Sequence, residues 1–226
     1  MKTLKAIFEN SFKICSKDLE RVPEKTVAYI VGSFKPPHAG HYNMAKEYAK
    51  FADKIVILVD NPKSKFKKMS NEKTITPEDS VKIWKMFLED GNFGVESDIV
   101  LLDKSGGYSE NQFEKITELA EKEAENVGKL TVIFGISDKD LEKASDQFTT
   151  VFNSLKNRDN IEVRSPESTA IKSEKLEKND NQISATELRE HPDNMDLLRR
   201  SMPNELTDEH FNEIYRILNP EKTVTN

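Results

Sequence analysis

The sequence predicts an α/β fold: a Rossmann-like three-layer sandwich with a five-stranded, mostly parallel sheet and C-terminal helices. Two observations lead to this prediction. Five apolar runs of strand length alternate with segments of helical pattern between residues 26 and 164. These runs are continuously apolar, which is typical of strands that helices cover on both faces of a parallel sheet. Right-handed crossovers between such strands then give three layers.

The first part of this pattern covers residues 26–91. The apolar run 26–32 predicts a strand, and 40–52 predicts a helix because small and aromatic side chains recur on one face. The run 54–60 predicts the second strand, before a lysine-rich loop at 61–75. A threonine cap at Thr76, a proline at the first helical position and acids in the first turn predict a helix that ends near Gly91.

The second part completes the sheet and adds a helical end. Strands are expected at 98–102, 129–134 and 161–164, with helices at 110–127 and about 138–156 between them. Residues 165–182 are polar and rich in serine and lysine, so we expect a mobile loop there. Three short helical patterns follow, interrupted by prolines. These helices are expected at 184–190, 193–201 and 207–218. The expected domains are an N-terminal appendage (1–25), the α/β domain (26–190) and a C-terminal helical segment (191–226).

Composition excludes several classes of protein. With 226 residues the chain is long enough for a substantial core, and its one cysteine, Cys15, rules out an internal disulfide framework. No apolar run approaches the roughly 18 residues of a membrane-spanning helix, and the N-terminus lacks the apolar stretch of a secretion signal. The formal net charge of −6 makes nucleic acid an unlikely partner. We therefore expect a cytoplasmic protein without a membrane partner.

The most informative segment is Gly32–His41, which reads Gly-Ser-Phe-Lys-Pro-Pro-His-Ala-Gly-His. It connects the first predicted strand to the first predicted helix. Ligands of open α/β sheets bind at this kind of position, and a helix N-terminus offers N–H groups and a positive dipole end to an anion. His38 and His41 add hydrogen bonds there. The segment therefore predicts a phosphate site.

A second candidate is the lysine cluster at 61–68, which follows the second predicted strand. In a parallel sheet this is the same edge as the histidine loop, so the lysines would face the same anion. The alternative is a solvated loop whose charge only aids solubility. Sharing the sheet edge with the histidines favours the functional interpretation.

A third candidate is the segment Gln182–Arg189, which reads Gln-Ile-Ser-Ala-Thr-Glu-Leu-Arg. Ser184 is placed to cap a helix, Thr186 lies in its first turn, and Arg189 falls one turn later. Hydroxyls, N–H groups and an arginine together form a phosphate clamp. Taken alone, the segment is better explained as an ordinary helix cap with a surface arginine, because Ser-x-Thr patterns are common.

Together the three segments resemble the nucleotidyltransferase superfamily of the H-x-G-H type, whose members include cytidylyltransferases and nicotinamide-mononucleotide adenylyltransferases. The resemblance covers about residues 26–190. It implies transfer of a nucleoside monophosphate from a nucleoside triphosphate to a small-molecule acceptor, with Mg²⁺ accompanying the triphosphate and with a homo-oligomer as a possible assembly. The N-terminal appendage and the proline-interrupted C-terminal helices further resemble phage-encoded members, which implies the host cytoplasm.

The resemblance also assigns roles to residues. His38 and His41 match the paired histidines that hold the triphosphate and stabilise charge at the α-phosphoryl centre. Lys63 or Lys65 matches the lysine near the transferred group, and the sequence does not decide between them. The remaining matches are the loop that approaches the nucleotide and the clamp on the β- and γ-phosphates: Gly32, Ser33, Phe34, Lys35 and Gly40 in the loop, and Ser184, Thr186 and Arg189 in the clamp.

Three further positions bear on the acceptor or the nucleoside. Lys35 stands where several relatives carry an acid or an amide, and Ser80 stands where some relatives carry an arginine. Asp138 follows the fourth predicted strand at the same sheet edge, where it either contacts ribose or the acceptor or caps a helix. Trp84 lies on the apolar face of a helix and is expected in the core. No protein ligand to a metal is predicted.

ATP is favoured over CTP as the donor because residues 178–182, Lys-Asn-Asp-Asn-Gln, replace the Arg-Thr-Glu-Gly run that cytidylyltransferases usually carry before Ile-Ser. The alternatives are a cytidylyltransferase acting on a polyol phosphate and a non-catalytic nucleotide-binding module, with residues 1–25 and 191–226 as docking segments. Nucleic-acid binding rests only on the lysines at 63–68.

Overall fold

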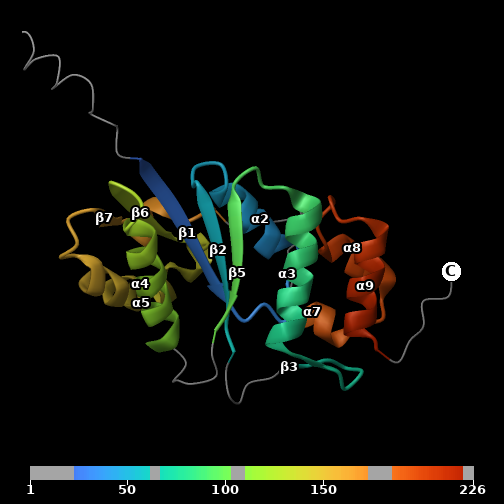
Figure 1. Cartoon of the computed structure of the whole chain (residues 1–226). Helices are drawn as coiled ribbons and strands as arrows, with labels where there is room; N and C mark the ends of the chain where they lie inside the picture. Colours follow the sequence, from blue (N-terminus) through green and yellow to red (C-terminus); the bar gives the residue numbers. More distant parts are fainter. Residues whose placement is uncertain (1–22, 62–66, 103–109, 173–184, 221–226) are drawn as a thin grey trace, which may run out of the picture.

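The fold is a five-stranded parallel sheet between helical layers, as predicted. The computed structural model describes residues 23–61, 67–102, 110–172 and 185–220. The strands are β1 (Glu24–Gly32), β2 (Lys54–Val59), β5 (Glu96–Leu101), β6 (Lys129–Phe134) and β7 (Ile161–Val163). They lie in the order β5-β2-β1-β6-β7, and every neighbouring pair is parallel. Figure 1 shows this order from β7 at the left to β5 in the centre.

Two hydrophobic clusters, one on each face of the sheet, form the core. Helices α2 (Ala39–Tyr48) and α3 (Pro77–Gly91) cover one face, where Ile30 and Ile57 are among the buried strand residues. Helices α4 (Glu110–Ala124) and α5 (Leu141–Leu155) cover the other face, where Tyr29 and Leu58 are buried. Because successive strand residues point to opposite faces, each continuously apolar strand supplies both clusters.

The strand order places a topological switch point between β1 and β6. From β1 the chain moves outward through β2 to β5, and from β5 it returns to the other side of β1 to form β6 and β7. The segments that follow β1 and β6 therefore leave the sheet toward opposite faces. Phe134 pairs with Tyr29, whereas β1 runs on to Gly32, so β6 ends first. Open α/β sheets bind ligands at this kind of topological switch point.

Helix α3 begins as its sequence predicts. Thr76 has extended backbone angles and accepts from the Asp79 N–H, while the Asp79 carboxylate accepts from the Thr76 N–H in return. This reciprocal pair satisfies two of the donors that every helix leaves open at its start. It fixes the N-terminal end of α3 beside the histidine loop, where Ser80 lies in the first turn.

Two regular elements lie where the sequence predicted only loops. A short antiparallel hairpin, β3 (Lys67–Lys68) with β4 (Thr74–Ile75), occupies the end of the predicted lysine-rich loop. The predicted mobile loop at 165–182 begins instead with the short helix α6 (Pro166–Thr169), followed by Ile171 in an isolated parallel bridge to Ser137. Residues 173–182 of that prediction lie outside the described residues.

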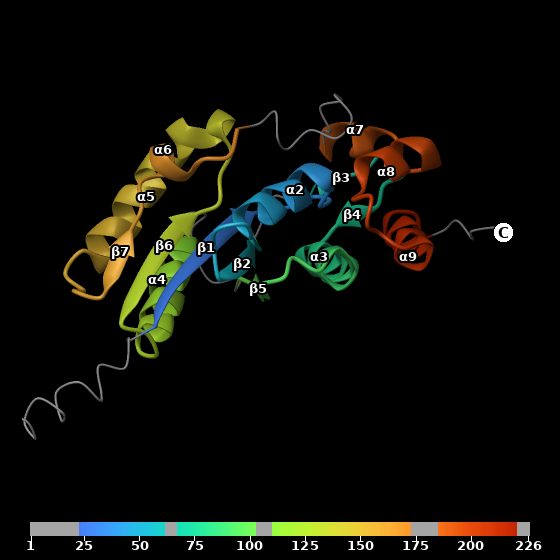
Figure 2. The same cartoon turned by 90° about the horizontal axis from the view of Figure 1, so that it is seen from above.

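The C-terminal helices form part of the main core. Helices α7 (Ala185–Glu190), α8 (Met195–Ser201) and α9 (Asp208–Leu218) contribute to the same cluster as α2 and α3, with Leu188, Leu198 and Phe211 buried. Figure 2 shows α8 and α9 beside α3, at the end of the molecule remote from β7. Residues 191–218 are therefore packed against the α/β unit along one side.

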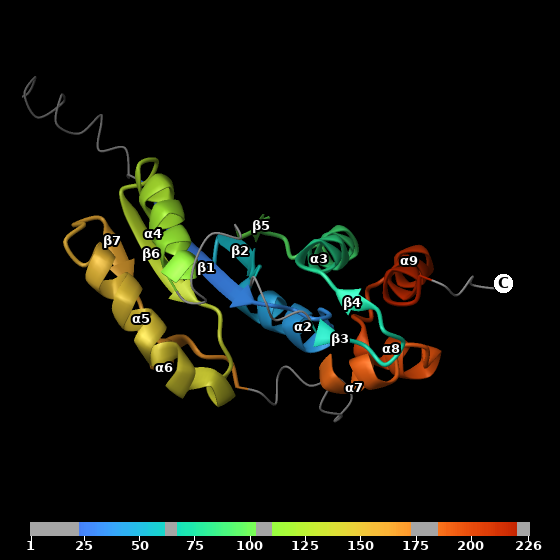
Figure 3. The same cartoon turned by 90° about the horizontal axis from the view of Figure 1, so that it is seen from below.

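The β3–β4 turn is tied to these helices by hydrogen bonds, and Figure 3 shows β3 next to α7 and α8. The Ser70 N–H donates to the Arg189 carbonyl (2.8 Å). The Asn71 amide donates to the Leu218 carbonyl and to the Asn219 side-chain oxygen, both at 3.0 Å. The hairpin thus owes its position to contacts with residues more than a hundred positions away in sequence.

The described helices include none with the length and apolar character that a membrane crossing requires.

Candidate active site

The two motif histidines cap helix α2. His38 is the N-cap residue, with extended backbone angles, and its Nδ1 accepts a hydrogen bond from the Gly40 N–H (3.1 Å). The Nδ1 of His41 accepts from the His38 N–H (3.3 Å). The rings lie face to face at a tilt of 34°, with centroids 3.9 Å apart. The pattern is a capping box in which imidazoles replace the usual hydroxyl and carboxylate.

These hydrogen bonds assign the tautomer of both rings. A ring nitrogen that accepts from a backbone N–H carries no proton, so the proton of each neutral imidazole resides on Nε2. No described residue accepts a hydrogen bond from either Nε2. The pair therefore presents two Nε2–H donors at the positive end of a helix dipole, after β1 at the switch point between β1 and β6.

Burial keeps both rings neutral. Desolvation lowers the pKa of His38 from 6.5 to about 4. Desolvation and the neighbouring His38 lower the pKa of His41 well below its ordinary value. Protonation at Nδ1 would also place a hydrogen against the backbone N–H that now donates there. Before a ligand binds, the histidines are therefore neutral donors and not cations.

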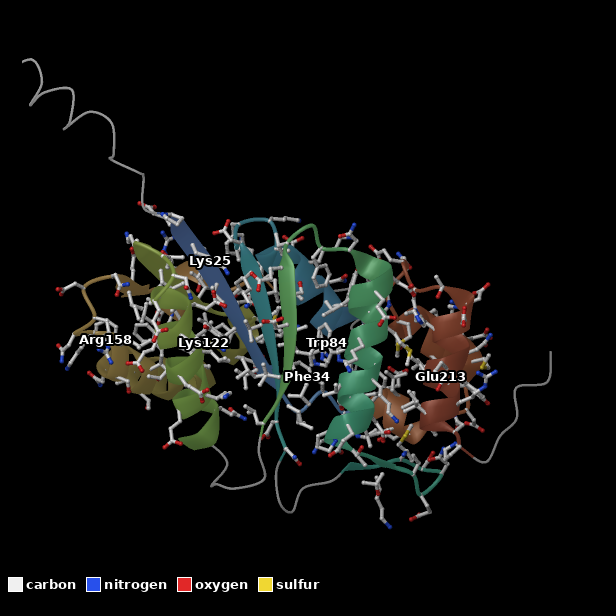
Figure 4. All side chains as sticks on the ribbon, in the orientation of Figure 1. Lys25, Phe34, Trp84, Lys122, Arg158 and Glu213 are labelled. Atoms are coloured by element: carbon white, nitrogen blue, oxygen red, sulfur yellow. The ribbon has the colours of Figure 1, made fainter. Side chains whose placement is uncertain are left out.

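Phe34 supports the histidine pair from beneath. Its ring is 4% exposed and makes edge contacts with His41 (centroids 5.0 Å apart) and with Trp84 (5.3 Å). Figure 4 labels Phe34 and Trp84 in the region between the sheet and α3. Its φ of 44° lies in the left-handed region, which is unfavourable for a bulky residue and persists only where surrounding contacts hold it. One such contact is the Ser80 hydroxyl, which donates to the Phe34 carbonyl (2.7 Å).

Gly32 is required by the same arrangement. A Cβ added at Gly32 would lie 2.8 Å from a ring carbon of Phe34, closer than packed carbon atoms approach. The residues after Phe34 continue the loop: the Lys35–Pro36 peptide bond is cis, and the Lys35 side chain is buried. Ser33 is half-buried. The extra positive charge at Lys35, where several relatives carry an acid or an amide, is therefore on a buried residue.

Arg189 joins α7, which we call the clamp helix, to the loop Gly32–His41, which carries the two histidines. Its guanidinium donates to the Lys35 carbonyl (2.6 Å) and to the Thr186 hydroxyl (2.7 Å). Residues 154 positions apart in sequence are thereby joined in one site, as the predicted convergence of the two motifs requires. Because a guanidinium carries five N–H groups, these two bonds leave others for a ligand.

The segment after β6 lies on the other side of the switch point. Asp138 is exposed and begins a short 3-10 helix (Asp138–Asp140) whose N-cap is Ser137, so the alternative that Asp138 caps the helix is wrong. The Ser137 hydroxyl, which is buried, donates to the Asp140 carboxylate (3.0 Å). A Cβ at Gly135 would approach Ile30 to 2.4 Å, so this segment passes tightly over β1.

Three predicted site residues, Lys63, Lys65 and Ser184, lie outside the described residues. The structure adds two observations that no sequence pattern indicates. One is the contact of Ser80 with Phe34, and the other concerns Asn61, which follows β2. The Asn61 side-chain oxygen is buried and finds no donor among the described residues. Trp84 is fully buried, which confirms its place in the core. In the described part of the chain, no three His, Cys, Asp or Glu side chains gather in a way that would hold a metal ion.

Comparisons with known proteins bear on the fold and the family. A bifunctional NMN adenylyltransferase/ADP-ribose pyrophosphatase from Francisella tularensis superposes with a TM-score of 0.51 at 14% identity, over 87% of this chain and 51% of that chain. The chain thus spans about half the length of that protein. A nicotinic acid mononucleotide adenylyltransferase from Plasmodium falciparum gives a TM-score of 0.47 at 12% identity, over 87% of this chain and 96% of that one. At these identities the first likeness shows the fold.

No curated protein matches the chain significantly. The family model described as cytidylyltransferase-like matches residues 29–191, well over half of the 226 residues and the whole span from β1 to the clamp helix. That span contains the histidine pair, the loop that Phe34 supports and the arginine that bridges to it. The chain therefore belongs to the cytidylyltransferase-like family of the nucleotidyltransferase superfamily.

Proposed function

We propose that this protein transfers a nucleoside monophosphate, AMP from ATP, onto a phosphorylated small-molecule acceptor and releases pyrophosphate. Family membership supports nucleotidyl transfer in general. The observation that carries the proposal is the neutral histidine pair at the start of α2, with both Nδ1 atoms occupied by backbone N–H groups and Arg189 bonded into the same loop.

The chemistry needs few covalent partners from the protein. An oxygen of the acceptor phosphate attacks the α-phosphorus, the bond from that phosphorus to the bridging oxygen breaks, and pyrophosphate leaves with the electron pair. The attacking phosphate is already an anion, so no base has to remove a proton. Such reactions depend on positioning and on donors aimed at the developing charge.

The described residues supply those donors. The Nε2–H groups of His38 and His41 and the α2 dipole stabilise charge on the phosphoryl oxygens. Arg189 and Thr186 are placed to hold the leaving pyrophosphate, since a guanidinium matches phosphate geometry. Mg²⁺ enters as part of the substrate, because it retains waters and binds triphosphate oxygens readily. Lys63 or Lys65, Ser184 and Asp138 complete the proposed set from sequence.

ATP is the favoured donor because residues 178–182 differ from the Arg-Thr-Glu-Gly run that cytidylyltransferases usually carry there, and CTP is the alternative that the family's own description keeps open. The test is pyrophosphate release with each of four nucleoside triphosphates and Mg²⁺. Nicotinamide mononucleotide, phosphopantetheine and glycerol 3-phosphate serve as acceptors. We expect release with ATP that depends on an acceptor. Release with CTP alone would establish the cytidylyl alternative, and triphosphate binding without release would establish a non-catalytic module.

A matched pair of variants tests the role of the site. In His41→Asn the amide oxygen is placed to accept from the His38 N–H, so the cap is kept while the Nε2–H donor is lost. We expect turnover to fall by about 100-fold or more, as for loss of one oxyanion donor. The control is His191→Asn, the same replacement at an exposed histidine after α7. Unchanged turnover in His41→Asn would refute the proposed role.

A further inference from the structure

Tyr48, near the end of α2, makes an unusual set of contacts that nucleotidyl transfer as described above does not use. Its side chain is fully buried. Its hydroxyl lies 2.9 Å from the Thr169 carbonyl, 3.1 Å from the Ile136 carbonyl and 3.2 Å from the Phe134 carbonyl. It also accepts a hydrogen bond from the Ile136 N–H (3.1 Å). One hydroxyl thus contacts two other segments of the chain, residues 134–136 and residue 169.

These contacts satisfy backbone groups of the two segments, among them the Ile136 N–H. A hydroxyl has one hydrogen to donate and two lone pairs to accept with. Its hydrogen is shared among three carbonyls, of which Thr169 is nearest, and one lone pair serves the Ile136 N–H. A buried N–H without an acceptor is costly, so loss of the hydroxyl forces the Ile136 segment to move or to admit water. Burial raises the pKa of Tyr48 to about 12, so the hydroxyl keeps its proton at neutral pH.

The segment held in this way directly follows β6, at the switch point between β1 and β6. The Ile171 N–H donates to the Ile136 carbonyl (3.1 Å), and the Asp138 N–H donates to the Ile171 carbonyl (3.0 Å). Residues 136–138 and 169–171 therefore form one unit, and Tyr48 fastens it to the helix that the two histidines begin. Asp138 and the buried Ser137 belong to this unit, which is the β6 side of the switch point.

We propose that Tyr48 is a positioning residue for the nucleotide: its hydroxyl sets the spacing between the histidine helix and the segment 136–138 that faces the nucleoside. This inference rests on the proposed function. The phosphates would lie against the start of α2, and the nucleoside would lie against the segment after β6. A fixed spacing between these two walls lowers the ordering cost of binding the triphosphate.

The alternative is a tyrosine that stabilises the core without affecting the ligand. Tyr29 provides a matched control within the same chain. It is equally buried, it lies on β1 under the other face of the sheet, and its hydroxyl has no hydrogen-bond partner among the described residues. Tyr29→Phe and Tyr48→Phe therefore delete the same atom from two buried tyrosines, and only the second deletion breaks contacts to residues 134–136 and 169.

The experiment compares the wild-type protein with both variants, at a temperature well below the unfolding transition of each. Dissociation constants for MgATP come from calorimetry, and KM and kcat come from pyrophosphate release with the acceptor found for the wild type. Hydrogen exchange is followed at the amides of Ile136, Asp138 and Ile171. We expect Tyr48→Phe to raise the ATP dissociation constant and KM by about five- to tenfold, the loss typical of one buried hydrogen bond. We also expect kcat to change much less and the three amides to exchange faster.

Tyr29→Phe should match the wild type in nucleotide affinity and in exchange at the three amides. Faster exchange in Tyr48→Phe with unchanged ATP affinity and KM would overturn the positioning role and leave a structural one. Unchanged exchange would show that the hydroxyl does not hold the segment. A wild-type protein that binds ATP but transfers nothing would contradict the proposed catalysis alone, because the affinity comparison still decides the inference. A wild-type protein that binds no triphosphate would overturn both.

Discussion

Replacing His38 by asparagine separates the two roles that the structure assigns to this residue. As the N-cap of α2, His38 accepts from the Gly40 N–H through Nδ1 (3.1 Å). As a proposed catalytic residue, it donates through Nε2. Asparagine is among the best N-cap residues, and its side-chain oxygen accepts the same kind of bond. His38→Asn therefore keeps the cap and removes the donor, whereas His38→Ala removes both.

The expected magnitudes differ for the two variants. Both should lose turnover by about 100- to 1,000-fold, because each lacks one donor to the developing charge. His38→Ala should be less stable than His38→Asn by about 1 kcal/mol, the usual worth of an N-cap. Comparing the two variants with each other largely cancels the cost of losing the buried imidazole, since both lack it.

The pH dependence of stability gives a second magnitude. Burial holds the pKa of His38 at about 4, against 6.5 for an exposed histidine. The unfolded chain therefore binds a proton that the folded chain excludes between these values. The contribution of neutral His38 to the free energy of unfolding is fully present above pH 6.5, and it is lost as the pH drops toward 4. At roughly 1.4 kcal/mol per pH unit, His38 alone accounts for a loss on the order of 3 kcal/mol across this range.

Urea unfolding at a series of pH values from 4 to 8, with pyrophosphate release at pH 8, measures all of these quantities. We expect the free energy of unfolding of His38→Asn to fall less steeply between pH 6.5 and 4 than that of the wild type. His41, whose pKa is lowered in the same direction, contributes to the slope that remains, together with carboxylates of lowered pKa such as Asp90 and Glu123. Wild-type turnover in His38→Asn, or an unchanged pH slope, would refute this account of the histidine pair.

Three further changes have defined outcomes. Arg189→Lys loses the planar donor to the Lys35 carbonyl, so KM for the triphosphate should rise about tenfold while melting curves change little; an unchanged KM would argue against a clamp. Gly32→Ala places a methyl group against the Phe34 ring and should lower stability by about 1–3 kcal/mol in urea unfolding, and a neutral result would show that the ring has room to move. Glu72→Gly relieves a φ of 64° in the β3–β4 turn and should be neutral or stabilising by up to about 1 kcal/mol, with activity kept; clear destabilisation would contradict the turn geometry.

The sheet and its flanking helices were predictable because their signals are local. Continuous apolar runs mark the strands, and the Thr76–Asp79 capping box marks the start of α3 at the residue where it occurs. Strand ends were less accurate. For example, β5 begins at Glu96, before the apolar run, because Glu96 and Asp98 pair with Lys54 on the neighbouring strand. Ion pairs across strands leave no pattern in a single sequence.

The β3–β4 hairpin and α6 were missed for a related reason. The hairpin strands have two residues each, and the turn between them is held by the Arg189 carbonyl and the end of α9. The helix α6 and Ile171 are held in part by the Tyr48 hydroxyl and the Ile136 carbonyl. Such elements exist only through contacts with distant parts of the chain, so local propensity does not reveal them.

The residues of the candidate site could be proposed from the sequence, but their geometry could not. The sequence pointed to His38, His41 and Arg189, because their motifs lie at the expected edge of a parallel sheet. It did not show that Nδ1 of each histidine is occupied by a backbone N–H, nor that Arg189 bonds to the Lys35 carbonyl. Both features depend on a backbone conformation that tertiary contacts impose.

The central claim, that the bond at the α-phosphorus is the one that breaks, is tested most directly with labelled nucleotide. The protein is incubated with Mg²⁺ and the acceptor that supports pyrophosphate release, using ATP radiolabelled either at the α- or at the γ-phosphate. The account predicts that the α-label appears in the acceptor product and that the γ-label appears in pyrophosphate. It also predicts that His41→Asn abolishes most of the transfer of the α-label and most of the release of the γ-label. Transfer of the γ-label to the acceptor, or its release as inorganic phosphate with ADP, would contradict it.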